Sequence, residues 1–336
     1  MRYLVTGGGG FLGLEIVRRL RARGDEVISY SRTKHPAVER SGARSVQGNL
    51  TDELKLAEAM RGCDGVFHVA AKAGIWGPKA DYALTNIGGT RSVVRAVRTA
   101  GISRLVHTSS PSVCFDGRDH LEADNRLPLA LETLSKQSIS AYAWSKAEAE
   151  QLVQAAHGPE LTTVILRPHL IFGHGDPHLL PRVAMRAQRR KLFAVGTRTN
   201  RVSLCHVTNA AHAHVQAMDR LHPAAAHAGK AYFINQTESV CLWDWLDQLC
   251  RELNWPTSRG PIPLWLARSA GALAEACWSW LSLTGEPPIT RFTAMQLALS
   301  HTYSMGPAQR DFGYQEQVDL AAATADAVRW LREVDT

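Results

Sequence analysis

Short apolar runs alternate with helical patterns along the first two-thirds of the chain. Residues 2–7 (RYLVTG), 65–70 (GVFHVA) and 162–168 (TTVILRP) are apolar almost throughout. Strands of this kind are buried on both faces, whereas strands with one face in water alternate polar and apolar residues. The same pattern predicts strands at 26–31, 45–50 and 104–110, separated by helices at 11–24, 54–62, 86–101 and 141–156. The alternation predicts a parallel sheet covered by helices on both faces.

The pattern changes after Pro168. The next segment is rich in Gly, Pro, His and basic residues, and the last hundred or so residues are helical and rich in Trp. KAYFIN (230–235) is a further apolar run, which predicts a strand that returns to the main sheet. We therefore predict a first domain of residues 1–168 with 206–235, and a smaller, mainly helical C-terminal cap domain of residues 169–205 and 236–336.

One apolar stretch, residues 263–283, approaches the length of a membrane-spanning helix. Arg268 and Glu275 stand inside it, and Gly271 interrupts it. These residues favour a buried or interfacial helix over a membrane span. Whether this helix contacts a membrane, a partner or the substrate is left open by the sequence.

The formal net charge of +7 is spread along the chain, and the short basic runs at 18–24 and 186–191 are typical of helix faces. A basic balance fits a phosphorylated cofactor or substrate. The sequence contains no signature of a DNA- or RNA-binding module, so a nucleic-acid partner is ranked last.

The six cysteines form no CxxC pair, which favours free thiols in a reducing compartment over disulfides or a zinc site. His206, His212 and His214 lie close together, but their spacing is not that of a zinc motif and no carboxylate accompanies them. No metal is predicted. The N-terminus runs directly into a strand without a signal segment, and we expect a cytoplasmic protein with no transmembrane span.

The segment VTGGGGFLG places Gly7, Gly10 and Gly13 between the first predicted strand and the first predicted helix. Residues without a Cβ let the backbone approach a pyrophosphate, and the amide groups at a helix N-terminus attract its negative charge. Because the glycines follow a strand and open a helix, they predict a Rossmann-type, doubly wound α/β fold that binds a dinucleotide.

The end of the second predicted strand indicates which dinucleotide is bound. An acidic residue at this place would accept hydrogen bonds from the adenosine ribose and repel a 2′-phosphate. Here Ser31 and Arg32 stand instead, with Lys34 close behind. Arg32 can bind a phosphate with its planar cation, which predicts a preference for NADP(H).

AYAWSK places Tyr142 and Lys146 four residues apart on a predicted helix, so that both side chains share one face. A neighbouring ammonium group lowers the pKa of a phenol and suits Tyr142 to proton transfer. Ser109 and Ser110 end the strand at 104–110, where we expect both to be exposed and one of them to orient a substrate carbonyl.

TGGGGFLG, HVAAKAG, NIGGT, HTSSPSV, YAWSK and LRPHLIFGHGD occur in the order typical of extended short-chain dehydrogenases/reductases, and the chain resembles their 3β-hydroxysteroid dehydrogenase-like branch. The resemblance implies catalysis by Tyr142, Lys146 and Ser110, support from Asn86, and a homodimer. It further implies a cofactor site made of Gly7, Gly10, Phe11, Leu12, Gly13, Ser31, Arg32, Asn49, Leu50, Ala70, Ala71, Lys72, Asn86, Thr108, Tyr142, Lys146 and Pro168.

Further segments, among them AKAGIWG, GEPPITRF and YSMGPAQRDFGY, are similar to the ketoreductases of this branch that serve bacterial olefin biosynthesis. That similarity implies NADPH-dependent reduction of the 3-keto group of long-chain 2-alkyl-3-oxoalkanoates, with the proton coming from Tyr142, and assembly with other enzymes of the pathway. The chain departs from the family pattern at Asn49, His174 and Thr208, of which Asn49 bears on an adenine contact.

Alternative functions remain open at this point. A 3β-hydroxysterol dehydrogenase or a nucleotide-sugar epimerase would use the same fold, and a non-catalytic NADP(H)-binding regulator would need only the glycine loop. The presence of Tyr142 and Lys146 argues against the regulator. Trp76 and the tryptophans of the C-terminal region suit a large apolar ligand better than a sugar nucleotide; those tryptophans are residues 243, 245, 255, 265, 278, 280 and 330.

Overall fold

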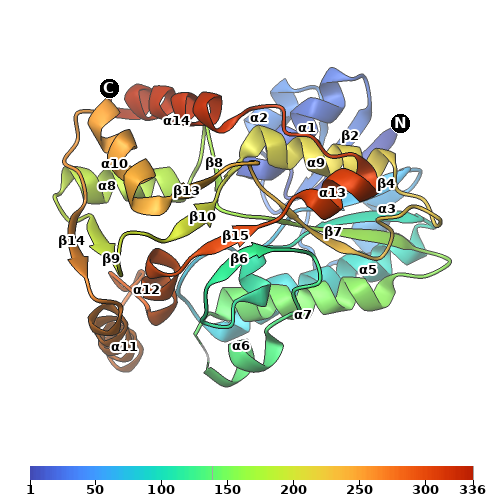
Figure 1. Ribbon diagram of the computed structural model, residues 1–336. Coiled ribbons are helices and arrows are strands. Elements are labelled where there is room, and N and C mark those ends of the chain that lie inside the picture. Colours follow the sequence, from blue (N-terminus) through green and yellow to red (C-terminus); the bar gives the residue numbers. More distant parts are fainter. Residues whose placement is uncertain (138, 336) are drawn as a thin grey trace.

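A seven-stranded parallel sheet forms the centre of the first half of the molecule (Figure 1). The computed structural model describes residues 1–137 and 139–335. The strand order is β12-β7-β5-β4-β1-β2-β3. The strands are β1 (Arg2–Thr6), β2 (Glu26–Ser31), β3 (Arg44–Gln47), β4 (Gly65–His68), β5 (Arg104–Thr108), β7 (Thr162–Pro168) and β12 (Ala231–Ile234). The predicted doubly wound α/β fold is confirmed.

Helices cover both faces of this sheet, and successive residues of β1 show why. Tyr3 and Val5 pack into the core beneath α1 (Phe11–Ala22) and α9 (Val207–Asp219), whereas Leu4 points to the opposite core. Helices α3 (Glu53–Met60), α5 (Gly89–Thr99) and α7 (Ala141–Ala156) cover that opposite face. A strand between two apolar layers needs no polar residues, which explains the continuous apolar runs.

The remaining elements near this sheet are short. They are α2 (Pro36–Arg40), α4 (Lys79–Tyr82), the π-helix η1 (Ala83–Gly88), the 3₁₀-helix η2 (Pro111–Cys114), β6 (His120–Ala123), α6 (Leu131–Gln137) and α13 (Gly306–Phe312). Although α13 comes late in the sequence, it packs beside β12, and Phe312 belongs to the core under α1 and α9.

The other half of the molecule has its own apolar core, in which Trp243 is fully buried. Its helices are α8 (Leu179–Gln188), α10 (Leu242–Glu252), α11 (Leu264–Trp280), α12 (Arg291–Ala298) and α14 (Leu320–Asp335). Short strands complete it: β8 (Ile171–Phe172), β9 (Phe193–Val195), β10 (Arg201–Ser203), β11 (Cys205–His206), β13 (Ser239–Cys241), β14 (Arg259–Ile262) and β15 (His301–Tyr303). The boundaries between the two predicted domains stay a prediction.

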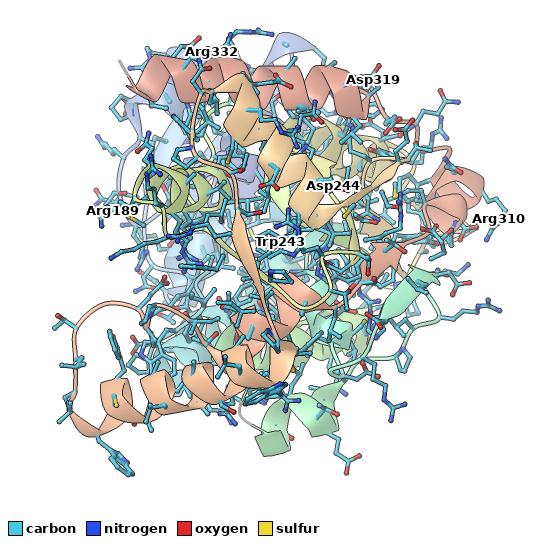
Figure 2. All side chains as sticks on the ribbon, turned by 60° about the vertical axis from the view of Figure 1, so that its left-hand side comes forward. Arg189, Trp243, Asp244, Arg310, Asp319 and Arg332 are labelled. Atoms are coloured by element: carbon cyan, nitrogen blue, oxygen red, sulfur yellow. The ribbon has the colours of Figure 1, made fainter. Side chains whose placement is uncertain are left out.

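The apolar stretch at 263–283 forms α11 at the edge of the molecule. In Figure 2 this helix stands at the lower left, apart from the packed side chains of the centre. Among residues 1–137 and 139–335, no helix combines the length and the hydrophobicity that crossing a membrane requires.

Candidate active site

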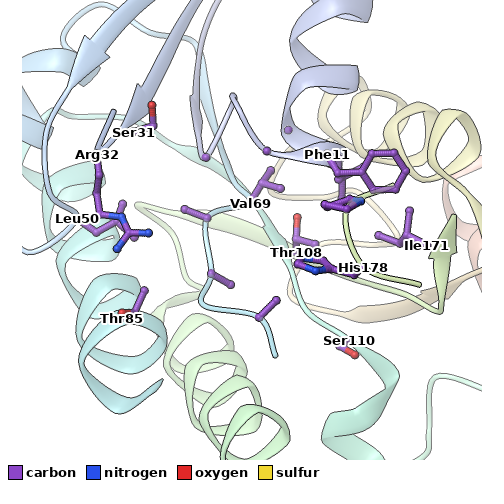
Figure 3. Close-up of a pocket in the computed structure, with 18 of the residues that line it drawn as sticks. Phe11, Ser31, Arg32, Leu50, Val69, Thr85, Thr108, Ser110, Ile171 and His178 are labelled. Atoms are coloured by element: carbon purple, nitrogen blue, oxygen red, sulfur yellow. The ribbon is translucent and has the colours of Figure 1, made fainter. Parts of the chain in front are cut away.

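A cavity of about 730 Å³ lies at the carboxyl ends of the parallel strands. The chain passes from β1 to β2 and β3 and then crosses to β4 on the other side of β1, and ligands of such sheets bind at this switch of direction. Figure 3 shows Ser31, Arg32, Leu50 and Thr85 at one end of the cavity, and Phe11, Ile171 and His178 at the other.

Most residues of the implied cofactor site line this cavity. They are Gly7, Gly10, Phe11, Leu12, Gly13, Ser31, Arg32, Asn49, Leu50, Ala70, Ala71, Thr108, Tyr142, Lys146 and Pro168, and Ser110 lines it with them. Lys72 and Asn86 do not line it. They form a second layer, in which the Asn86 side chain bonds both the amide and the carbonyl of Lys72 and donates to the Ser145 Oγ.

The glycine loop has the geometry that a pyrophosphate requires. Gly7 has a φ of +69°, and a Cβ there would lie 2.8 Å from the Ala70 Cα. A Cβ on Gly13 would lie 2.2 Å from the Gly7 carbonyl oxygen. Helix α1 begins after Gly10 with neither a side-chain cap nor an acidic residue in its first turn. The helix N-terminus is therefore well suited to an anion, and the residues fit a dinucleotide.

The end of the cavity beside β2 is lined by Ser31, Arg32, Thr33 and His35. The Ser31 hydroxyl donates to the Thr33 carbonyl at 2.7 Å, and Arg32 reaches into the cavity beside Leu50 (Figure 3). Among the residues that line the cavity in the described chain, the only carboxylate is Asp176, which instead caps the N-terminus of α8. The arrangement leaves Arg32 without a competing negative charge. Lys34 does not line the cavity.

Helix α7 presents Tyr142 and Lys146 to the cavity one turn apart. Its N-cap is Ser140, whose hydroxyl accepts a hydrogen bond from the amide of Ala143, so Tyr142 and Lys146 lie in the first two turns of a capped helix. Helix η2 follows Ser110, whose hydroxyl accepts hydrogen bonds from the amide and the hydroxyl of Ser112 and which lies at the cavity with Tyr142 and Lys146. The structure thus brings together the three predicted catalytic residues.

The electrostatics of this group differ from the prediction in one respect. Burial raises the pKa of Tyr142, and the group that lowers it is Ser110 rather than Lys146. The Lys146 Nζ donates to the Thr108 carbonyl at 2.6 Å and lies 3.5 Å from the His107 Nε2. Burial lowers the pKa of Lys146 to about 8, against the opposing charge of Glu150.

The two adjacent serines have different surroundings. The side chain of Ser109 is buried and donates to the Glu150 Oε2 at 2.5 Å, and Glu150 is paired with the buried Arg167. The prediction that Ser109 is exposed is therefore wrong. Both serines line the cavity, but Ser110 is half-buried and its hydroxyl is not bonded to Glu150, which favours Ser110 as the serine of the site.

Several cavity residues were not predicted. His35 lies against the glycine loop, so close that a Cβ on Gly9 would overlap its ring. Thr6, under the cavity, accepts the amides of Val69 and Ala70 and bonds the His68 Nδ1, which fixes the loop after β4. No local pattern marks such residues, since their partners are remote in sequence. The far wall adds Leu170, Ile171, Pro177, His178 and Leu179.

The proposed substrate-side tryptophans do not line the cavity. Trp76 accepts a hydrogen bond from the Tyr82 hydroxyl through its carbonyl, and Trp243 and Trp245 are buried in the second core. His174 and Thr208 also lie outside the cavity. His206 is paired with Asp326, and His214 with Thr108. Within the described ranges, no cluster of three or more His, Cys, Asp or Glu residues has the arrangement of a metal site.

Comparison with known proteins agrees with this geometry. The 3-beta hydroxysteroid dehydrogenase/isomerase family matches residues 4–264. The chain is 43% identical to the 2-alkyl-3-oxoalkanoate reductase of Stenotrophomonas maltophilia (strain K279a) over 95% of this chain and 96% of that protein. It is 39% identical to the protein of the same name from Shewanella oneidensis, over 94% of this chain and 82% of that one.

Solved structures show the same fold. The UDP-glucose-4-epimerase of Stenotrophomonas maltophila with bound NAD aligns with a TM-score of 0.77 at 21% identity, covering 100% of this chain and 99% of that one. A dTDP-glucose 4,6-dehydratase of Streptomyces venezuelae, also with NAD, aligns with a TM-score of 0.76 at 24% identity, covering 99% and 97%. Proteins of this superfamily use nicotinamide cofactors. The chain belongs to the 3-beta hydroxysteroid dehydrogenase/isomerase family and is an oxidoreductase of the extended short-chain dehydrogenase/reductase type.

Proposed function

We propose that the protein reduces the 3-keto group of long-chain 2-alkyl-3-oxoalkanoates to the 2-alkyl-3-hydroxyalkanoates, using NADPH. The main support is that Ser110, Tyr142 and Lys146 line the same cavity as the glycine loop and Arg32. The names of the two relatives at 43% and 39% identity support the substrate class.

In this proposal the chain's own residues hold the reactants and supply a proton. Bound in the cavity, NADPH supplies the hydride that adds to the C3 carbonyl carbon. Ser110 and Tyr142 bind the carbonyl oxygen, and Tyr142 delivers its phenolic proton to that oxygen as negative charge develops there. The high pKa of the buried phenol keeps this proton in place until then.

The cofactor is held by three parts of the cavity. The backbone amides that follow Gly10 would bind the pyrophosphate, Arg32 the 2′-phosphate, and Lys146 the ribose beside the nicotinamide. NADPH is preferred in this proposal because Ser31 and Arg32 replace the acidic residue that would repel the 2′-phosphate.

The cofactor preference is tested with Arg32→Ala. Loss of a charge-assisted hydrogen bond should raise the KM for NADPH about 10- to 100-fold while leaving the KM for NADH nearly unchanged. Steady-state kinetics with both cofactors measures this. An unchanged KM for NADPH, or equal kcat/KM values for the two cofactors in the wild type, would contradict the assignment.

The substrate preference follows from the far wall of the cavity. Leu170, Ile171 and Leu179 are apolar, which suits alkyl chains better than a sugar nucleotide.

We also propose that the protein acts in the cytoplasm as a homodimer, and that its domains divide as predicted above. Its pathway in this proposal is olefin biosynthesis, in assembly with other enzymes of that pathway. A regulator without activity is disfavoured because Tyr142 and Lys146 are both present.

The direct test compares two substrates in parallel. NADPH oxidation is measured with a long-chain 2-alkyl-3-oxoacid and with a 3-oxosteroid, and the reverse reaction with the corresponding 3-hydroxy acid and NADP⁺. We expect turnover of the alkyl acid at a kcat/KM at least tenfold above that of the steroid, a difference of about 1.4 kcal/mol. A preference for the steroid would move the assignment to sterols, and no turnover of either would favour a regulator.

A further inference from the structure

Helix α11 carries a large apolar surface that no other part of the described chain covers. Trp265 and Trp280, near its two ends, are 69% and 86% exposed, and Leu273 between them is 67% exposed. Leu266 on the same helix, and Leu281 and Leu283 directly after it, are also exposed. Single exposed apolar residues are common, but so many on one helix and its end mark an interaction surface.

The opposite face of α11 is firmly attached. Ala267, Gly271 and Glu275, one turn apart, are its buried residues and face α12. A Cβ on Gly271 would lie 2.7 Å from the backbone of Thr290 and Arg291, so the two segments touch directly. The Glu275 carboxylate accepts the amide and the Nε of Arg291, both at 2.7 Å. The contact with the start of α12 therefore fixes α11 so that its apolar face is exposed to solvent (Figure 2).

The charges around this helix favour an anionic surface as its partner. Both carboxylates between residues 259 and 291 are neutralised, Glu275 by Arg291 and Glu286 by Arg182. Arg268, exposed on α11, has no ion pair within the part of the chain that the structure describes. Three more basic residues, 189–191, lie between the end of α8 and β9, and β9 pairs with β14, which leads into α11.

The same helix is connected to the active site. The segment that follows it places Glu286 beside Gly74, and the Glu286 charge is the second cause, after burial, that raises the pKa of Tyr82. The ring of Tyr82 packs edge-on to that of Tyr142, with the centroids 6.5 Å apart. A partner bound to α11 would therefore lie next to the segment with Glu286, which is linked to Tyr142 through Tyr82.

We propose that α11 inserts its apolar face, with Trp265, Leu273 and Trp280, into the interfacial region of an anionic phospholipid bilayer. Tryptophan on an apolar face, together with nearby arginines and no free carboxylate, is the composition of helices that lie in a membrane surface. The choice of lipid over a protein partner rests on the proposed function, because long-chain 2-alkyl acids partition into bilayers and would reach the active site from there.

The test is flotation of the purified full-length protein with vesicles of phosphatidylcholine alone or with an equal part of phosphatidylglycerol. The wild type should float with the anionic vesicles and bind the neutral ones less. Leu273→Ser should weaken binding about tenfold, since an apolar side chain no longer enters the bilayer. Leu54→Ser is the matched control, because Leu54 is 84% exposed on the distant helix α3. The double variant Trp265→Ser/Trp280→Ser should remain in the soluble fraction.

Three outcomes would overturn the proposal. The first is that the wild type does not float, and the second is that Leu54→Ser and Leu273→Ser weaken vesicle binding equally. The third is that the double tryptophan variant converts a wild-type dimer to a monomer while vesicle binding is unaltered. The last outcome would make α11 a contact between copies of this chain. Vesicle binding is measured without substrate, so its result does not depend on the proposed reaction. Activity on a short, water-soluble 2-alkyl-3-oxoacid should be the same in all variants, and its absence from all of them would contradict the proposed reaction alone.

Discussion

At the end of β5, two adjacent serines have separate tasks. The Ser109 hydroxyl donates to the buried Glu150, whereas the Ser110 side chain faces the cavity and lowers the pKa of Tyr142 against the effect of burial. Neighbouring residues of an extended chain point to opposite sides, so only one of the two can serve the substrate.

Alanine substitutions should distinguish a catalytic role of Ser110 from a stabilising role of Ser109. Ser110→Ala should lower kcat about 100-fold, since it removes a donor to the developing oxyanion, and should change stability little. Ser109→Ala should keep kcat within a factor of about three and lower the free energy of unfolding by about 2 kcal/mol, because a hydrogen bond to a buried charge is lost. Steady-state kinetics and urea denaturation measure both. The opposite pattern would reassign the catalytic serine to Ser109.

Local signals in the sequence were sufficient to predict residues whose relative positions are set within a single turn or helix. The spacing of Gly7, Gly10 and Gly13, and the four-residue step from Tyr142 to Lys146, follow from the geometry of one turn and one helix. The burial of Ser109 could not be predicted in this way, because it depends on Glu150, which lies 41 residues further along the chain. The same holds for His35 and its contact with the glycine loop.

At the scale of elements, α7 connects the candidate active site to the sheet. Tyr142, Lys146 and Glu150 follow one another at four-residue steps along its buried side. Glu150 is fully buried and pairs with Arg167 of β7, whose side chain is 3% exposed. A buried pair of this kind holds the helix in register against the strand.

Removal of one partner of the Glu150–Arg167 pair should destabilise the folded protein strongly. Glu150→Ala leaves Arg167 as an uncompensated buried charge and should lower the free energy of unfolding by about 3–5 kcal/mol. Arg95→Ala, which breaks the exposed pair with Glu53, should cost no more than about 1 kcal/mol and serves as the control. Urea denaturation compares them, and equal losses would show that the Glu150–Arg167 pair is not needed for stability.

The elements also differ in how far the sequence predicted them. The long apolar strands and the amphipathic helices of the sheet were predicted because they carry many residues of one pattern. Strands such as β10 and β15 have only three residues each and form a four-stranded sheet with β6 and β13, which no periodicity indicates. Helix α11 was predicted as a helix, but its exposure depends on Glu275 turning inward to Arg291.

At the scale of the whole molecule, buried histidines make the fold sensitive to acid. Burial lowers the pKa of His68 to about 3 and that of His214 to about 4. Burial also lowers the pKa values of His107, His169 and His301. These rings stay neutral in the folded state, whereas in the unfolded chain they bind protons below about pH 6.5.

Stability should therefore fall as the pH decreases below about 6.5, since the unfolded state then binds more protons than the folded state. His68 and His214, whose pKa values lie below 5 in the folded state, should each contribute a loss of about 2 kcal/mol between about pH 7 and pH 5. His214→Gln should reduce the total loss by that amount, while His222→Gln, at an exposed site, should not alter it. Urea denaturation at the two pH values measures this. A loss in the His214 variant as large as in the wild type would contradict it.

The central claim is that Tyr142 protonates a ketone that NADPH reduces in this cavity. Its most direct test is a single-turnover measurement of NADPH oxidation by excess enzyme with a long-chain 2-alkyl-3-oxoacid, in the wild type and in Tyr142→Phe. The account predicts a rate about 1,000-fold lower in the variant, with the affinity for NADPH unchanged, because only the proton donor is lost. Wild-type turnover by Tyr142→Phe would contradict it.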